Sequence, residues 1–333
     1  MRFHMHLLPT YFPGEDPPFD VYFKQVLEQV QLAEELGFDA FWFTEHHFVL
    51  YGGPVPNPAM IMSAAAARTS RIHLGSAISI LPLHHPVQVA EDYAMVDVLS
   101  GGRLNLGVGS GYLAHEYAGF GVDPEDKRAR FDEALEILLR AWTGERFSHA
   151  GRYHQVRDVR LNVTPVQKPR PPVWVATLRT DGGARIGARG LPAMFIPYAS
   201  AETQAEMAAG LAAYRAAFVA AGGRADGATA PFGLHAFCGD SIAEARAEAR
   251  PAMERYVRTR LYAVQRPFET LVEQDVVAIG DPDEILRVAR RYAAAGFTHF
   301  LAIANFGGMP HKRVLRSMEL MAKHVLPHLP GEP

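Results

Sequence analysis

Three adjacent side chains, Glu45, His46 and His47, are the residues of this 333-residue sequence best suited to acid–base chemistry. Histidine titrates near neutral pH and is often used for proton transfer, and a neighbouring carboxylate can orient or charge an imidazole. The cluster directly follows residues 39–44, an apolar segment typical of a β-strand. We predict that His46 is catalytic and that Glu45 and His47 assist it. The alternative is a pair of hydrogen-bonded histidines in an ordinary loop.

A metal site is a competing interpretation of the same cluster. Adjacent residues of an extended chain point to opposite sides, so His46 and His47 are poorly placed to share an ion. The sequence has no H-E-x-x-H spacing, and its single cysteine, Cys238, excludes a cysteine-rich site. We therefore expect no metal.

Two glycine-bearing turns also follow apolar segments. Residues 107–112 (GVGSGY) depart from the dinucleotide fingerprint because the last glycine falls one residue early. Glycine there would let a flat ligand or its phosphate approach the backbone. Residues 178–183 (LRTDGG) precede a helical pattern and carry Arg179, a combination typical of phosphate binding. The alternative for this second turn is a plain loop with a surface arginine.

The elements that must position these residues alternate regularly between strand and helix. Helical patterns separate eight predicted strands, at residues 3–8, 39–44, 72–81, 104–108, 173–177, 193–197, 232–238 and 299–304. Such alternation implies parallel pairing, and eight strands in a chain of this length favour one α/β domain, a closed (β/α)8 TIM barrel over residues 1–333. An open doubly wound sheet with a second domain would need a linker near the middle.

Two segments depart from the alternation. The only linker candidate, residues 145–170, is polar, and the alternation resumes beyond it, so we interpret it as a hairpin insertion. Residues 256–279 have no clear role in a barrel; they would form a lid that excludes water, or a long surface excursion. Barrel active sites lie at the carboxyl ends of the strands, where the histidine cluster and both glycine turns fall.

Composition narrows the class of protein. Hydrophobic residues make up 48% and charged residues 21%, with a net charge of −3. These values are typical of a globular protein and give no reason to expect a nucleic-acid partner. No apolar run is long enough to cross a bilayer, and the amino-terminal residues lack a signal-peptide pattern. We expect a cytoplasmic protein without a membrane partner.

The motifs, taken in order, resemble those of the bacterial luciferase-like flavin monooxygenase family over nearly the whole chain. The matching stretches are GFD at residues 37–39, FWFTEHHF at 41–48, NP at 57–58, LP at 81–82, HPV at 85–87, AED at 90–92, SGGR at 100–103, GVGSG at 107–111, Arg128, RGLP at 189–192 and GDP at 280–282.

This resemblance implies a barrel that binds FMN and forms a homodimer. It implies that a separate NAD(P)H-dependent reductase supplies reduced FMN, which reacts with dioxygen and oxidises the substrate through a flavin hydroperoxide. His46 matches the catalytic histidine of luciferases, and Ala77-Ile78 matches a turn with a non-prolyl cis peptide against the flavin. The cofactor contacts we predict are Ala77, Ile78, Ser110, Gly111, Tyr112, Arg128, Arg179, Thr180, Gly182 and Gly183.

Departures from luciferase argue against light emission. An arginine and a reactive cysteine of luciferase are replaced here by Ser110 and Gly109, and a glutamate-serine phosphate loop by Leu178-Arg179. Our hypothesis is that Arg179, together with Arg128, supplies the positive charge at the phosphate.

The function predicted is oxidation of a small apolar or aromatic molecule by a two-component flavin-dependent monooxygenase. A deazaflavin-dependent, hydride-transferring reductase of the same superfamily is one alternative, and a non-catalytic flavin-binding protein is another. The substrate class rests on aromatic residues expected at the barrel mouth: Tyr11, Phe12, Phe48, Tyr51, Tyr112, Tyr198 and Phe306.

Overall fold

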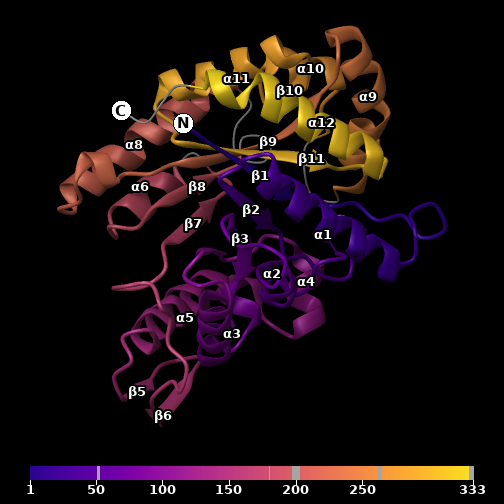
Figure 1. The fold of residues 1–333 in the computed structure, drawn as a ribbon. Coiled ribbons are helices and arrows are strands. Elements are labelled where there is room, and N and C mark those ends of the chain that lie inside the picture. The colour runs from indigo at the N-terminus through magenta and orange to yellow at the C-terminus, as the bar shows by residue number, and fades with distance from the viewer. Residues whose placement is uncertain (51–52, 180, 197–202, 261–264, 330–333) are drawn as a thin grey trace.

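Eight parallel strands close into a barrel in the computed structural model, which describes residues 1–50, 53–179, 181–196, 203–260 and 265–329. Helices surround this barrel (Figure 1). Its strands, in spatial order, are β1 (Arg2–Leu7), β2 (Ala40–Phe43), β3 (His73–Ile80), β4 (Leu104–Gly109), β7 (Val173–Thr177), β8 (Ala193–Phe195), β9 (Pro231–Cys238) and β11 (His299–Asn305). The barrel closes where Phe195 of β8 pairs with Phe232 of β9, and β11 returns to β1. The predicted fold is confirmed.

A helix follows each barrel strand. In chain order the larger helices are α1 (Phe19–Glu35), α2 (Pro58–Ala66), α3 (Pro86–Leu99), α5 (Lys127–Ala141), α8 (Gln204–Ala220), α9 (Ile242–Thr259), α11 (Pro282–Ala295) and α12 (His311–His324). The shorter ones are α4 (Ala114–Phe120), α6 (Gly182–Gly187) and α10 (Phe268–Glu273). Among the described helices, none is long and apolar enough to cross a membrane.

Local sequence signals account for the helix ends. Asn57 caps α2 by accepting a hydrogen bond from the Met60 amide, and Pro58 follows at the first helical position. Thr203 and Glu206 form a capping box at the start of α8. Gly296 ends α11 in the left-handed conformation, which glycine adopts without steric cost.

Alternation along each strand decides which side chains face the barrel interior. In β2, Phe41 and Phe43 pack outward against the helix layer, whereas Ala40 and Trp42 belong to a separate buried cluster with Trp174. Because alternate residues of an extended chain point to the same side, Thr44 and His46, which follow the strand, also point into the barrel. This is how a short apolar strand aims polar side chains at the barrel mouth.

Two features lie in the segments that depart from the alternation. Within residues 145–170, β5 (Phe147–Ala150) and β6 (Gln155–Val159) pair antiparallel, apart from the barrel (Figure 1). Within residues 256–279, α10 is followed by β10 (Val277–Gly280), a fully buried strand that pairs with the second half of β9. The sequence reading missed β10. Whether any part of residues 256–279 moves as a lid stays a prediction.

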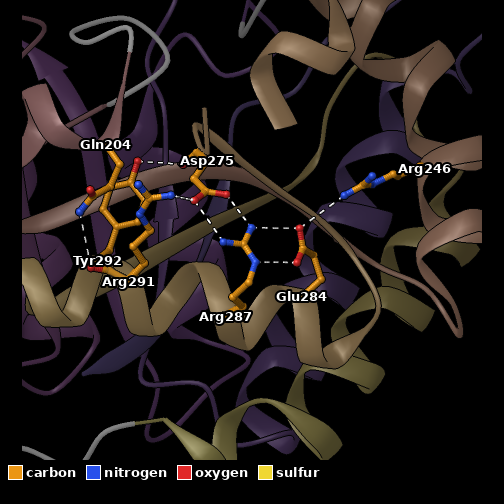
Figure 2. Close-up of polar contacts among 7 residues, drawn as sticks. All are labelled: Gln204, Arg246, Asp275, Glu284, Arg287, Arg291 and Tyr292. Atoms are coloured by element: carbon orange, nitrogen blue, oxygen red, sulfur yellow. Dashed lines mark hydrogen bonds and ion pairs between the residues drawn. The ribbon is translucent and has the colours of Figure 1, made fainter. Parts of the chain in front are cut away.

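An ion-pair network secures the start of β10. The buried Asp275 carboxylate accepts hydrogen bonds from Arg287, at 2.6 and 3.2 Å, and pairs with Arg291, both on α11 (Figure 2). Arg287 also bonds Glu284, which contacts Arg246 of α9. The network therefore links the start of β10 to α9 and α11.

Candidate active site

A cavity of about 550 Å³ opens at the carboxyl ends of the barrel strands. This size is typical of small-molecule and cofactor sites. It joins the histidine cluster to both glycine turns. The predicted site residues that line it are Glu45, His46, Ala77, Ile78, Ser110, Gly111, Tyr112, Arg128, Arg179 and Gly182.

Two predicted site residues that the structure describes, His47 and Gly183, are not among those lining the cavity. His47 is buried and points to Glu45 instead. A Cβ on Gly183 would lie 3.1 Å from both Phe195 and Tyr214, so this glycine serves helix packing rather than ligand approach. Thr180 lies outside the described residues.

His46 is held by a carboxylate that sequence reasoning missed. Its Nδ1 donates to Glu116 Oε1 at 2.9 Å, and the backbone amide of His47 donates to the same oxygen at 2.8 Å. Glu116 lies on α4, just beyond β4, and is fully buried. The signal available in the sequence was an acidic residue shortly after a strand end, within an otherwise weakly polar stretch. This contact fixes the His46 ring at the cavity wall.

Glu45 accepts hydrogen bonds from two histidine side chains and one backbone amide. Its Oε1 accepts hydrogen bonds from Nε2 of His84 at 2.6 Å and Nε2 of His47 at 3.1 Å, and its Oε2 accepts from the Ile80 amide at 3.2 Å. Burial raises the pKa of Glu45, but the bonds from His47 and His84 outweigh burial and lower it to about 2. Glu45 is therefore ionised at neutral pH. His84 was not anticipated.

The side chains of Glu45, His47 and His84 are also of the types that could together bind a metal ion. Zinc–ligand bonds of about 2.1 Å at tetrahedral angles separate ligand atoms by roughly 3.4 Å. The oxygen–nitrogen distances of 2.6 and 3.1 Å are those of hydrogen bonds. The geometry thus favours a hydrogen-bonded triad over a metal centre.

A bulge in β3, residues 76–79, forms one wall of the cavity. The register with β4 shifts here, and the Ala77–Ile78 peptide is cis, as the family resemblance implied. A Cβ on Gly107 would lie 2.1 Å from the Ser76 carbonyl oxygen, and one on Gly109 would lie 2.2 Å from Ile78 Cδ1. These two glycines therefore admit the neighbouring strand. The interpretation that glycine here admits a ligand needs correction for Gly107, whereas Gly109 also lines the cavity.

Basic side chains gather along one side of the cavity, on α5 and in the loop and helix after β7. They are Lys127, Arg128, Arg179, Arg185 and Arg189. Arg179 is exposed and bonds Asp181 at 2.9 Å, so it is already paired with a carboxylate. Arg189 pairs with Asp132, which also lines the cavity. Lys127, Arg185 and Arg189 were absent from the predicted set.

Most of the other cavity-lining residues are neutral. His6 is hydrogen-bonded to Thr44 at 2.8 Å, and burial lowers its pKa to about 3, so it is uncharged at neutral pH. Buried Arg260 adds one cation beyond β9. Aliphatic side chains supply most of the remaining wall: Leu8, Ile78, Ile80, Met194, Ile196 and Ile303.

The expected aromatic mouth is largely wrong. Of the seven aromatic residues expected there, only Tyr112 is among the cavity-lining residues that the structure describes. Phe48 is exposed, at 67%, and Phe306 is buried elsewhere. Tyr51 and Tyr198 lie outside the described residues.

Comparison with known proteins decides the family. A family model described as luciferase-like monooxygenase matches residues 1–299. The chain belongs to the luciferase-like monooxygenase family. The expected family and the oxygenating class of enzyme are thereby confirmed.

Curated relatives of this luciferase-like chain differ in how much of it they match. Limonene 1,2-monooxygenase from Rhodococcus erythropolis is 30% identical over 99% of this chain and 87% of that protein. The oxygenase component of a flavin-dependent trigonelline monooxygenase from Acinetobacter baylyi is 31% identical over 46% of this chain and 43% of that protein. An uncharacterised Sinorhizobium fredii protein, y4vJ, is 43% identical, but the match spans only 45% of its length and 48% of this chain.

Solved structures extend the likeness to the whole barrel. The monooxygenase RslO1 from Streptomyces bottropensis has a TM-score of 0.92 and 31% identity, covering 98% of this chain and 99% of that one. The oxygenating constituent of 3,6-diketocamphane monooxygenase from Pseudomonas putida, in complex with FMN, has a TM-score of 0.83 and 20% identity over all of both chains. A coenzyme F420-dependent tetrahydromethanopterin reductase from Methanopyrus kandleri has a TM-score of 0.76 and 17% identity, and the match covers 99% of each chain. The last two show a shared fold alone.

Proposed function

We propose that this luciferase-like chain is the oxygenase of a two-component system that uses reduced FMN and dioxygen to oxidise a small, mainly apolar molecule. A separate NAD(P)H-dependent reductase would supply the reduced FMN. One observation carries the proposal: a single cavity joins His46, held by Glu116, to a row of basic side chains. A flat, phosphorylated cofactor requires this combination.

The residues of the cavity fit FMN. The β3 bulge offers an apolar floor through Ala77 and Ile78, against which an isoalloxazine ring would lie. A Cβ on Gly182 would lie 2.1 Å from Thr177 Oγ1, so the turn near the basic side chains stays compact only with glycine. Lys127 and Arg128, at the start of α5, would hold the phosphate.

The ion pair between Arg179 and Asp181 limits the part that Arg179 can play in binding the phosphate. A phosphate would have to compete with Asp181 for this guanidinium, and both side chains are more than half exposed. Exposed ion pairs contribute little to stability, so Arg179 can exchange Asp181 for a phosphate. We propose that Arg128 and Lys127 provide most of the phosphate affinity and that Arg179 assists.

Bound reduced FMN would supply the electrons that activate dioxygen. The chain's own contribution is to hold and move a proton at His46 while Glu116 fixes the ring through Nδ1. The second imidazole nitrogen, Nε2, would be the atom that exchanges the proton. Neutral His6 with Thr44 adds hydrogen-bonding capacity without charge, and the aliphatic wall would exclude water from the reacting atoms.

The substrate class follows from the cavity wall. Aliphatic side chains dominate it, so within the apolar or aromatic class expected from the sequence we propose an aliphatic or alicyclic organic substrate. The relative named for limonene acts on a compound of this kind by its name. Limonene is therefore a suitable first probe.

The test combines binding and isotope incorporation. Titration with oxidised and photoreduced FMN, under anaerobic conditions, is expected to give tighter binding of the reduced form. Supplying reduced FMN, ¹⁸O₂ and a panel beginning with limonene should place one ¹⁸O atom in a product detected by mass spectrometry. His46→Asn is expected to lower product yield on the order of 100-fold while FMN affinity is unchanged. Absence of FMN binding in both redox states would contradict the proposal.

The deazaflavin reductase is the second candidate, supported by the shared fold of the F420-dependent reductase. Binding of 8-hydroxy-5-deazaflavin without FMN binding, and reduction without ¹⁸O incorporation, would select it. A non-catalytic flavin-binding role would instead give FMN binding with no product from any substrate and no effect of His46→Asn.

A further inference from the structure

The buried Glu45 carboxylate forms hydrogen bonds with two different parts of the chain. Through Oε2 it holds the amide of Ile80, which directly follows the β3 bulge. Through Oε1 it meets His47 on its own loop and His84, which lies between β3 and α3. Glu45 therefore ties the loop after β2 to two points, Ile80 and His84, that both follow the β3 bulge in the chain.

His84 is the member of this triad that meets solvent. Its side chain is 30% exposed, whereas those of His47 and Glu45 are 7% and 1% exposed. The charged or titratable groups acting on it are Glu45 and, from α3, Asp92; His47 lies 6.2 Å away between ring centroids. The exposed ring of Phe120 lies 6.3 Å from the His84 ring, measured between ring centroids.

A buried carboxylate keeps its charge only where hydrogen bonds and opposite charge replace the lost hydration. His84 provides the shortest of the contacts to Glu45, and charged hydrogen bonds are roughly twice as strong as neutral ones. Loss of charge on His84 would weaken the hold on Glu45 and, through Oε2, on Ile80. The shape of the cavity floor would then be less firmly fixed.

We propose that His84 is a positioning residue: in its charged form it holds Glu45 against Ile80 and thereby fixes the β3 bulge on which the flavin lies. The inference rests on the proposed function, because it takes the bulge as the flavin floor. His84 touches neither the cavity nor the reacting atoms, and it acts through Glu45.

The contact between charged His84 and Glu45, which we call the clamp, should weaken as the pH rises. Burial lowers the pKa of His84, but the hydrogen bond and charge of Glu45 outweigh burial, so the pKa lies above its ordinary value. The clamp is therefore complete at the lower end of the neutral range and weakens as pH rises through the raised pKa. Glu45 stays ionised throughout, since its pKa is about 2.

The experiment measures the dissociation constant of oxidised FMN by fluorescence quenching between pH 7 and 9.5. This range begins about one unit above the second pKa of a phosphate ester, so ionisation of the ligand contributes little. Wild-type protein should bind FMN about three- to tenfold more weakly at the high end. His84→Gln, which cannot carry charge, should bind more weakly at pH 7 and show a flat profile. His85→Gln, a change at the exposed neighbouring histidine, should behave as wild type.

Direct titration of His84 in the wild-type protein provides a second measurement. Its imidazole resonance, assigned by its absence from His84→Gln, should titrate above the ordinary histidine range. A flat wild-type profile, an unchanged profile in His84→Gln, or binding of Zn²⁺ by the triad in equilibrium dialysis would overturn the proposal. If wild type bound no FMN, the proposed function would fail separately, whereas the clamp would still be decided by the His84 titration and by thermal unfolding of the two proteins over the same pH range.

Discussion

At the scale of single residues, the pairing of His46 with Glu116 is the contact on which catalysis would depend most. A carboxylate fixes the tautomer and direction of an imidazole, so its loss disturbs proton transfer more than ligand binding. The His47 amide shares the same oxygen, which couples the ring position to the backbone of the loop.

Glu116→Gln is therefore expected to reduce turnover by at least about tenfold, with FMN affinity changed less than twofold. Gln retains an oxygen for the His47 amide, so the loop should stay folded. The measurement is the rate of product formation with saturating reduced FMN. Glu125→Gln, at an exposed acidic residue of the same connection, is the matched control. Equal turnover in the Glu116 variant and wild type would show that the pair is only structural.

At the scale of elements, the close approach of β4 to the β3 bulge depends on Gly107. A side chain there meets a backbone carbonyl, which has no alternative rotamer. Gly107→Ala should lower the free energy of unfolding by about 1–3 kcal/mol through overpacking. Urea unfolding measures this. Gly227→Ala, where the nearest atom would be 3.8 Å away, should stay within about 0.5 kcal/mol of wild type.

The Asp275 network acts at the same scale, by fastening β10 to α11 (Figure 2). Burial raises the pKa of Asp275, but its bonds to Arg287 and Arg291 outweigh burial and lower it. The network therefore stabilises the folded state above the unfolded-state pKa of about 3.9, and this contribution is lost as pH falls toward the lowered pKa.

Asp275→Asn should reduce the free energy of unfolding at pH 7 by about 1–2 kcal/mol, a modest value because both arginines are about half exposed. Asn tolerates the positive φ of 54° at this position, so the backbone should be unaffected. The difference from wild type should shrink below about pH 4. Asp226→Asn, in the exposed pair with Arg224, is the control and should leave the free energy of unfolding close to that of wild type at either pH.

At the scale of the whole molecule, apolar side chains on neighbouring helices α2 and α3 support the predicted homodimer. Met60 is 72% exposed, Met95 51% and Leu99 56%. Met95 and Leu99 lie four residues apart on α3 and therefore on the same face of that helix, and exposed apolar side chains that cluster are typical of protein interfaces. We predict that this face is covered by a second copy.

Met95→Glu combined with Leu99→Glu should convert a dimer into a monomer in light scattering at micromolar concentration, because two carboxylates would be buried at the interface. Val219→Glu, at an exposed apolar position of α8, should leave the mass unchanged. A wild-type protein that is monomeric at all concentrations would contradict the prediction.

The sequence alone determined the period of the fold and the end of the barrel at which chemistry occurs. Strand–helix alternation is a local property, and the Glu45–His47 cluster follows its strand directly, so both could be read from neighbouring residues. The motifs in order gave the family. The 277–280 strand was missed because its pairing with β9 is long-range and a four-residue apolar run is ambiguous.

Only the tertiary structure decided which partners the predicted residues have. Glu116 and His84 lie 70 and 39 positions from the side chains they hold, and no local pattern fixes such distances. The glycines of β4 were interpreted as ligand contacts because sequence cannot tell which surface a missing side chain leaves room for. The direction in which a side chain points beyond a strand end is a local consequence of backbone geometry. Its hydrogen-bond partners, its burial and its charge depend on the elements that the folded chain places next to it.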